Sequence, residues 1–148
     1  MIGVTITPSQ IDYSKIITPE TVEKLIVGDC LILTAQAKEL VHVRSGQLKN
    51  SIMWKTEKKE GGFNTGGVEP APTDAKLRDN PGEDTGYVGS NLEYAGPVEY
   101  GRKDMPNYPR NPYLRPAVDY TKGERMERYK GIVAMAIKQA YKPGTNNG

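Results

Sequence analysis

The chain has 148 residues, with 20 Lys and Arg against 18 Asp and Glu, so its length fits one domain and its net charge of +2 argues against a dedicated nucleic-acid binder. A single cysteine excludes an intrachain disulfide, and no stretch approaches the 18 apolar residues of a membrane span. Sixteen Gly and 11 Pro predict much loop and a modest core, so we expect oligomerisation to supply part of the stability.

The N-terminal part of the chain predicts a short strand at residues 4–6 and then a long helix. Thr18 can cap the free backbone N–H groups of that helix, Pro19 suits the first helical position, and Glu20 suits the positive end of the helix dipole. Apolar residues follow at three- and four-residue spacing to about Val41. Gly28 weakens the middle of the helix or lets another backbone approach closely.

The central part predicts a short helix and two strands. Ser45 can cap the helix, and Leu48 with Ile52 would be its buried pair. Residues 53–58 alternate in polarity and predict a strand, and residues 85–90 predict another. We expect these strands to pair antiparallel across residues 59–84, a long loop or extended hairpin that is rich in Gly, Pro and charge.

The C-terminal part predicts a short helix or turn at residues 94–100, with Pro97 in its first turn, and a last helix that Pro116 opens and that runs to about Tyr141. The buried side of the last helix is predicted to carry its regularly spaced apolar residues, namely Val118, Met126, Tyr129, Ile132, Val133, Ala136, Ile137 and Ala140. Residues 142–148 are predicted to be a mobile tail.

These elements predict an α+β fold, with a small antiparallel β-sheet packed against two long helices and short helices, and with a long flexible loop. We expect one domain over residues 1–141. The N-terminus has no basic start followed by an apolar run, so we expect no signal peptide. We therefore expect the chain to assemble in the cytoplasm.

Catalytic chemistry finds little support in the sequence. His42 is the only histidine, and it follows a helix, where a packing or helix-end role is favoured over catalysis. Cys30 lies in an apolar segment typical of a buried structural thiol, about 18 Å along one helix from His42, which argues against a Cys–His pair. The Gly-rich run at residues 61–67 lacks the Lys-Ser/Thr that ends a phosphate-binding loop. We therefore predict no catalytic, cofactor or metal site.

Residues 94–101 and 111–117 instead combine aromatics, one carboxylate, Gly and Pro in a way that suits packing against a partner. If Glu99 is buried, it needs a partner such as Arg115 or Arg110, since the guanidinium fork can hold a carboxylate with two bonds. Pro112 and Pro116 stiffen the segment between them, which lowers the entropy lost on docking. An ordinary internal ion pair is the alternative interpretation.

Four motifs in series resemble the tail-completion or head–tail joining (neck) proteins of tailed bacteriophages. In chain order they are Arg44-Ser45-Gly46-Gln47-Leu48-Lys49-Asn50-Ser51-Ile52, Val88-Gly89-Ser90, Tyr94-Ala95 with Val98-Glu99-Tyr100-Gly101, and Pro112-Tyr113-Leu114-Arg115-Pro116-Ala117. The resemblance covers residues 18–141. Tyr113 stands where the family more commonly has Phe, and residues 59–84 have no counterpart in the pattern.

The resemblance implies a virion structural protein without catalytic activity that forms a ring, commonly hexameric, at the phage neck. The implied partners are further copies of the chain, a head-side connector or head-closure protein, and a tail terminator or tail tube protein. Double-stranded DNA would pass through the channel without sequence-specific binding, and assembly would take place in the host cytoplasm. Subunit or partner contacts are then predicted at Ser45, Leu48, Ile52, Tyr94, Glu99, Tyr100, Arg110, Tyr113, Leu114 and Arg115.

Other interpretations stay open at this stage. A tail-terminator or head-closure role in the same neck fits the motifs nearly as well. A small hydrolase that uses Glu99 would lose turnover but keep assembly in Glu99→Gln, and a DNA-binding module would lose duplex affinity steeply with salt. The acidic balance of residues 57–84, with seven Asp and Glu against four Lys and Arg, suits a loop that lines a DNA channel or an arm that orders on a neighbouring ring.

Overall fold

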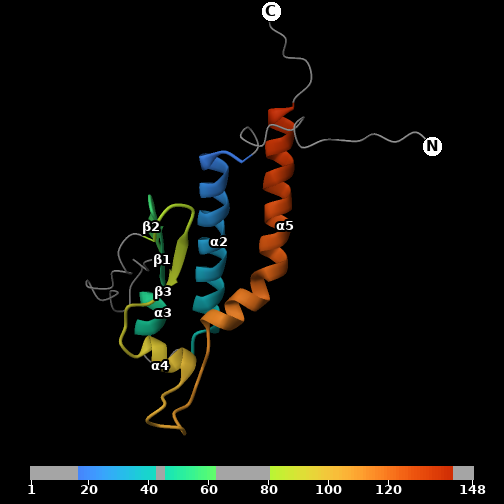
Figure 1. The fold of residues 1–148 in the computed structure, drawn as a ribbon. Helices are drawn as coiled ribbons and strands as arrows, with labels where there is room; N and C mark the ends of the chain where they lie inside the picture. Colours follow the sequence, from blue (N-terminus) through green and yellow to red (C-terminus); the bar gives the residue numbers. More distant parts are fainter. Residues whose placement is uncertain (1–16, 43–45, 63–80, 142–148) are drawn as a thin grey trace, which may run out of the picture.

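A computed structural model describes residues 17–42, 46–62 and 81–141. Two long helices, two short helices and a small sheet make up these residues, which confirms the predicted α+β fold (Figure 1). The elements in chain order are α2 (Pro19–Leu40), α3 (Gln47–Ser51), β1 (Met53–Thr56), β2 (Glu60–Gly61), β3 (Gly86–Gly89), α4 (Ala95–Tyr100) and α5 (Leu114–Ala140).

The sheet has three strands in the order β2-β1-β3, and both pairings are antiparallel. β1 and β3 pair in the register Trp54↔Val88, which confirms the pairing predicted from residues 53–58 and 85–90. β2 was not predicted, because its two residues lie within the stretch that reads as loop. Gly61 faces Trp54 in the ladder, and the indole ring lies so close that a Cβ at Gly61 would be 2.9 Å from its Nε1.

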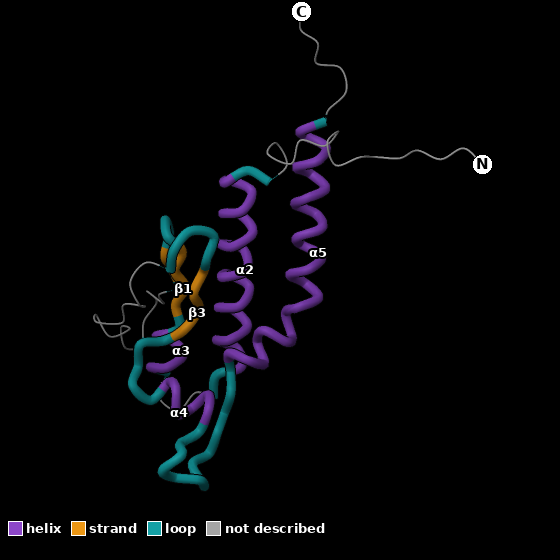
Figure 2. The backbone as a smooth tube through the Cα atoms, in the orientation of Figure 1, coloured by secondary structure: helices purple, strands orange, loops and turns teal. Residues whose placement is uncertain are grey.

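Helix α2 is the central layer of the molecule. The sheet lies along one side of α2 and α5 lies along the other, as the ribbon and the tube both show (Figures 1 and 2). Helix α2 starts where predicted. Thr18 is the N-cap residue, its hydroxyl accepts a bond from the Thr21 N–H at 3.2 Å, and Pro19 is the first helical residue. The helix ends at Leu40, one residue before the predicted end.

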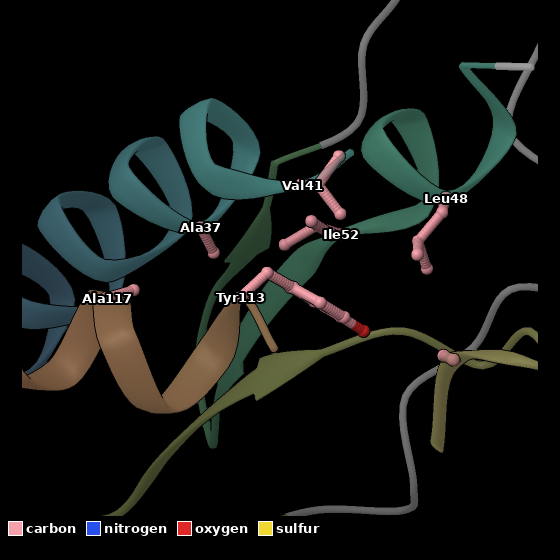
Figure 3. Close-up of a cluster of buried hydrophobic side chains, with 7 residues drawn as sticks. Ala37, Val41, Leu48, Ile52, Tyr113 and Ala117 are labelled. Atoms are coloured by element: carbon pink, nitrogen blue, oxygen red, sulfur yellow. The ribbon is translucent and has the colours of Figure 1, made fainter. Parts of the chain in front are cut away.

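The core lies where α2, α3 and the start of α5 meet (Figure 3). Its buried members come from four helices and the turns beside them, namely Ala37, Val41, Leu48, Ile52, Ala95, Tyr113 and Ala117. Leu48 and Ile52 are both buried, as predicted for the short second helix. Tyr113 is 1% exposed, and its side chain extends from the start of α5 beneath Ile52 (Figure 3).

The predicted buried side of the last helix is wrong. The buried residues of α5 are Ala117 and Thr121, both near its start. Val118, Met126, Val133 and Ile137 are each more than a third exposed, and the other predicted residues are only half-buried. The apolar residues of α5 follow no single helical face, so their spacing overstated the contact that α5 makes with the rest of the chain.

Several predictions fall outside the described residues. These are the strand at residues 4–6, the capping role of Ser45, most of the loop at residues 59–84, and the tail at residues 142–148. The short helix α3 begins after Gly46, whose φ of +76° is the left-handed conformation that glycine adopts without strain.

Candidate interaction site at the joint of α4 and α5

Glu99 from α4 caps the N-terminus of α5. Its Oε2 accepts bonds from the backbone N–H groups of Tyr113 at 2.7 Å and Leu114 at 2.9 Å, and its Oε1 accepts the N–H of Arg115 at 2.9 Å. These are among the N–H groups that a helix start leaves without an intrahelical acceptor, and a carboxylate there also suits the positive end of the helix dipole. The N-cap residue Tyr113 makes no side-chain cap bond of its own, so Glu99 supplies the cap from 14 residues earlier.

The partner expected for Glu99 is therefore corrected. Glu99 is 4% exposed, as the expectation required, but it binds backbone N–H groups in place of a guanidinium. The Arg115 side chain instead lies over the ring of Tyr100, with its Cζ 5.1 Å from the ring centroid. The stem of Arg110 packs against Gly101, where an added Cβ would be 2.9 Å from it. Both guanidinium-bearing residues are exposed at the surface of the joint.

Tyr113 anchors the joint to the core. Burial raises the pKa of its phenol to about 12, and the nearby Glu99 carboxylate contributes to the rise. The hydroxyl thus stays neutral at any physiological pH. The side chain fixes the residue whose N–H donates the shortest bond to Glu99, so the core contact and the helix cap stabilise the same backbone position.

The loop between α4 and α5, residues 101–113, projects from one end of the molecule (Figure 1). Gly101 starts it with φ +82° and ψ −174°, a conformation that glycine alone adopts readily. The Asn111 N–H donates to the Val98 carbonyl at 3.0 Å and closes the base of the loop, and the Tyr108 N–H donates to the Met105 carbonyl at 2.9 Å near its tip. These two backbone bonds restrict the loop at its base and near its tip.

Cations and aromatics surround a hollow of about 490 Å³ on this loop. Tyr100, Tyr108, Arg102, Lys103 and Arg110 are among its lining residues. Arg102 lies over the Tyr108 ring at 5.8 Å and pairs with exposed Asp104, which raises the pKa of the Arg102 guanidinium. Met105 is 49% exposed beside these charges. The loop thus carries an exposed apolar side chain together with several cations and aromatics, a combination found at protein interfaces.

The predicted contact residues divide into two groups. Leu48, Ile52, Glu99 and Tyr113 are buried inside this chain, and Leu114 is half-buried. Exposed side chains are those of Tyr94, whose hydroxyl donates to Gln47 at 3.5 Å, together with Tyr100, Arg110 and Arg115. Ser45 lies outside the described residues. The structure therefore brings residues 94–101 and 110–117 into one unit, in which the buried members shape the surface that the exposed members carry.

A second concave surface was not predicted from the sequence. A groove of about 550 Å³ runs between α2, β3 and α5, and its apolar lining includes Leu25, Ile26, Leu33, Val88, Ala117 and Val118. Asp84 lies at the groove in a turn with φ +53°, an unusual conformation for a residue with a side chain. Periodicity had assigned several of these side chains to a covered core, so no sequence signal marked them as an open surface.

Cys30 borders the same groove. It is buried, as predicted, and its burial raises the thiol pKa to about 11, with the neighbouring Asp29 and Glu23 carboxylates contributing. Gly86 of β3 lies directly against it, where an added Cβ would be 2.6 Å from Cys30 Sγ. The sulfur thus packs between helix and strand as a neutral thiol, and it is poorly suited to act as a nucleophile.

A polar cluster joins α2 to the distal part of α5. Asp29 forms ion pairs with Arg128 at 3.3 Å and with Arg125 at 3.5 Å, and it accepts a hydrogen bond from the Tyr129 hydroxyl. Arg128 lies across Gly28 and also donates to the Leu25 carbonyl at 3.0 Å. The close approach expected at Gly28 is real, but it comes from a side chain in place of a backbone.

The described residues hold no group of three or more His, Cys, Asp or Glu side chains arranged to bind a metal ion. Both oxygens of Glu99 already accept backbone bonds, and a carboxylate held in this way is a structural cap. Within the same residues, the helices are too short or too polar to cross a membrane.

Comparison of the chain with protein-family models, with curated proteins and with solved structures finds no match.

Proposed function

We propose that this chain is a structural protein of a tailed-bacteriophage virion and forms a ring at the neck, where it joins the head to the tail. The proposal rests first on the four motifs that resemble neck proteins. One observation supports it most: the two motifs around Glu99 and Tyr113 form one unit, because the carboxylate of one caps the helix that the other begins. Such a unit holds a loop rigidly at the surface.

In this proposal, the contacts of the chain are with further copies of itself, with a head-side connector or head-closure protein, and with a tail terminator or tail tube protein. Double-stranded DNA passes through the ring without sequence-specific contacts. A tail-terminator or head-closure role within the same neck is the nearest alternative. The proposed role involves no catalysis, and two observations are consistent with it: the Glu99 carboxylate caps a helix, and burial raises the pKa of the Cys30 thiol.

The test is the mass of the purified protein in solution, followed by electron microscopy. Light scattering should give a multiple of the 16.3 kDa subunit mass, and images should show a ring with a central hole wide enough for duplex DNA. A particle that stays at one subunit mass at every concentration, without rings, would contradict the proposal of a self-assembling ring.

A further inference from the structure

The projecting loop and the groove have complementary chemistry. Among the described residues that line it, the groove carries Asp84 as an exposed carboxylate over an apolar floor, while its other acid, Asp29, is paired with Arg125 and Arg128. The described lining of the hollow on the loop includes three cations, Arg102, Lys103 and Arg110, of which Arg102 is paired with Asp104. Opposite charges placed around two apolar surfaces favour one orientation of contact and disfavour like-with-like pairing.

The size of the groove also suits an inserted side chain. The groove has about 550 Å³ of space, a size that accommodates several side chains. Met105 extends near the tip of the loop and is 49% exposed, and the thioether side chain adapts easily to an irregular apolar surface. The backbone bonds at the base and tip of the loop, together with Pro106, Pro109 and Pro112, lower the entropy that docking would cost.

We propose that the loop at residues 101–113 of one copy inserts, Met105 first, into the groove between α2, β3 and α5 of a second copy. This inference rests on the proposed ring and names the contact that builds it. The two surfaces lie on different parts of each subunit, so the contact is head-to-tail. An open row of subunits therefore has a free loop at one end and a free groove at the other. A contact of this kind closes into a ring when the rotation that relates neighbouring copies brings the last copy back to the first.

On the groove side, the exposed acids are Asp84 and its neighbour Glu83, while Asp29 is already paired with Arg125 and Arg128. On the loop side, Asp104 pairs with Arg102, which leaves Lys103 and Arg110 as the cations best placed to meet a partner carboxylate. The apolar contact of Met105 carries most of the affinity in this scheme, and the charges set the orientation.

The experiment uses two variants that each remove one side of the contact. Met105→Asp places a charge on the loop, and Val118→Asp places one in the groove, at a residue that is 45% exposed and so tolerates the change in the isolated subunit. Each alone should weaken self-association about 30-fold or more, as expected for a central interface residue. Matched controls are Met135→Asp and Ile137→Asp, which are 62% and 44% exposed on α5, do not line the groove, and should associate like the wild type. Circular dichroism checks that all four variants keep the wild-type helix content.

Mixing the two variants tests the head-to-tail geometry directly. Met105→Asp keeps a working groove and Val118→Asp keeps a working loop, so an equimolar mixture can form one intact contact per pair and should stop at twice the 16.3 kDa subunit mass. Rings that persist in both variants would overturn the inference and leave the proposed function standing. A mixture that stays monomeric would also overturn it. A wild-type chain that never associates would refute both proposals together.

Discussion

The N-termini of the two long helices are stabilised in different ways. α2 begins with a cap from its own sequence, the Thr18 hydroxyl on the Thr21 N–H. α5 begins with a cap from another helix, the Glu99 carboxylate on three successive N–H groups. A local cap stabilises one helix end, whereas a distant cap also fixes α4 relative to α5. The Glu99 cap therefore also positions the loop that connects α4 to α5, whereas the Thr18 cap stabilises only the start of α2.

The two helices also differ in how they are covered. α2 packs on the sheet on one side and on α5 on the other, and its buried residues, Cys30, Thr34 and Ala37, are spread along its second half. α5 buries Ala117 and Thr121 near its start, and further along it is tied to α2 by the polar cluster around Asp29. The core thus depends on α2 and on the first turns of α5, while the rest of α5 combines half-buried apolar residues with the polar bonds to Asp29.

Removal of the distant cap should have the largest effect on stability. Glu99→Ala leaves three N–H groups at a buried helix start without their acceptor, and we expect a loss of about 2–4 kcal/mol in the free energy of unfolding. Urea unfolding followed by circular dichroism measures it. Glu93→Ala, an exposed change two residues before α4, is the control and should stay within about 0.5 kcal/mol. Equal stability of the two variants would refute the capping role.

Removal of the polar link between the helices should have the next largest effect. Asp29→Ala leaves two guanidinium groups and the Tyr129 hydroxyl without their shared acceptor, at about one-fifth side-chain exposure, and should cost about 1–2 kcal/mol. Glu127→Ala breaks the exposed pair with Lys130, 75% and 69% exposed, and should cost less than about 0.5 kcal/mol. If both changes cost the same in urea unfolding, the cluster around Asp29 does not hold α5.

Removal of the local cap should cost less than removal of the distant one. Thr18→Ala deletes one hydroxyl bond to an exposed helix end, and a loss of about 1 kcal/mol is expected. Thr18→Ser and Thr18→Asp keep an oxygen at the same position and should restore most of the stability. Thermal unfolding of the three variants side by side distinguishes capping from a simple packing effect, which the serine variant would not rescue.

The Cys30 thiol on α2 should react very slowly with alkylating reagents, and its ionisation should not affect stability at neutral pH. Because burial raises the pKa of Cys30 from 9.0 to about 11, the folded chain at pH 8 holds about one hundredth of the thiolate that the unfolded chain holds, and alkylation should slow by at least about that factor. The folded-state pKa lies above the unfolded one, so stability should fall as pH rises from about 9 toward 11. Rapid alkylation of the native chain at pH 8 would contradict the burial of Cys30.

Local signals in the sequence explain what could be predicted. Capping rules predict the start of α2 at Thr18-Pro19-Glu20, and apolar spacing predicts its end. Polarity alternation and flanking turn residues predict β1 and β3, which pair although they lie about 30 residues apart. The partner of Glu99 could not be predicted, because a carboxylate and the backbone N–H groups of a helix 14 residues away leave no pattern in the residue types. Apolar spacing in α5 misled for a related reason, since it records that Val118 or Ile137 is apolar but not whether any element of the same chain covers it.

The central claim of this account is that Glu99 binds the start of α5 and so holds the joint and its loop in a fixed conformation. Amide hydrogen exchange measured by NMR on the wild-type protein tests it most directly. The N–H groups of Tyr113, Leu114 and Arg115 should exchange at least about 100-fold more slowly than that of Lys103 in the exposed loop, because each is bonded to a carboxylate at a closed helix start. Exchange of all four at similar rates would show that the cap is open in solution and would contradict the account.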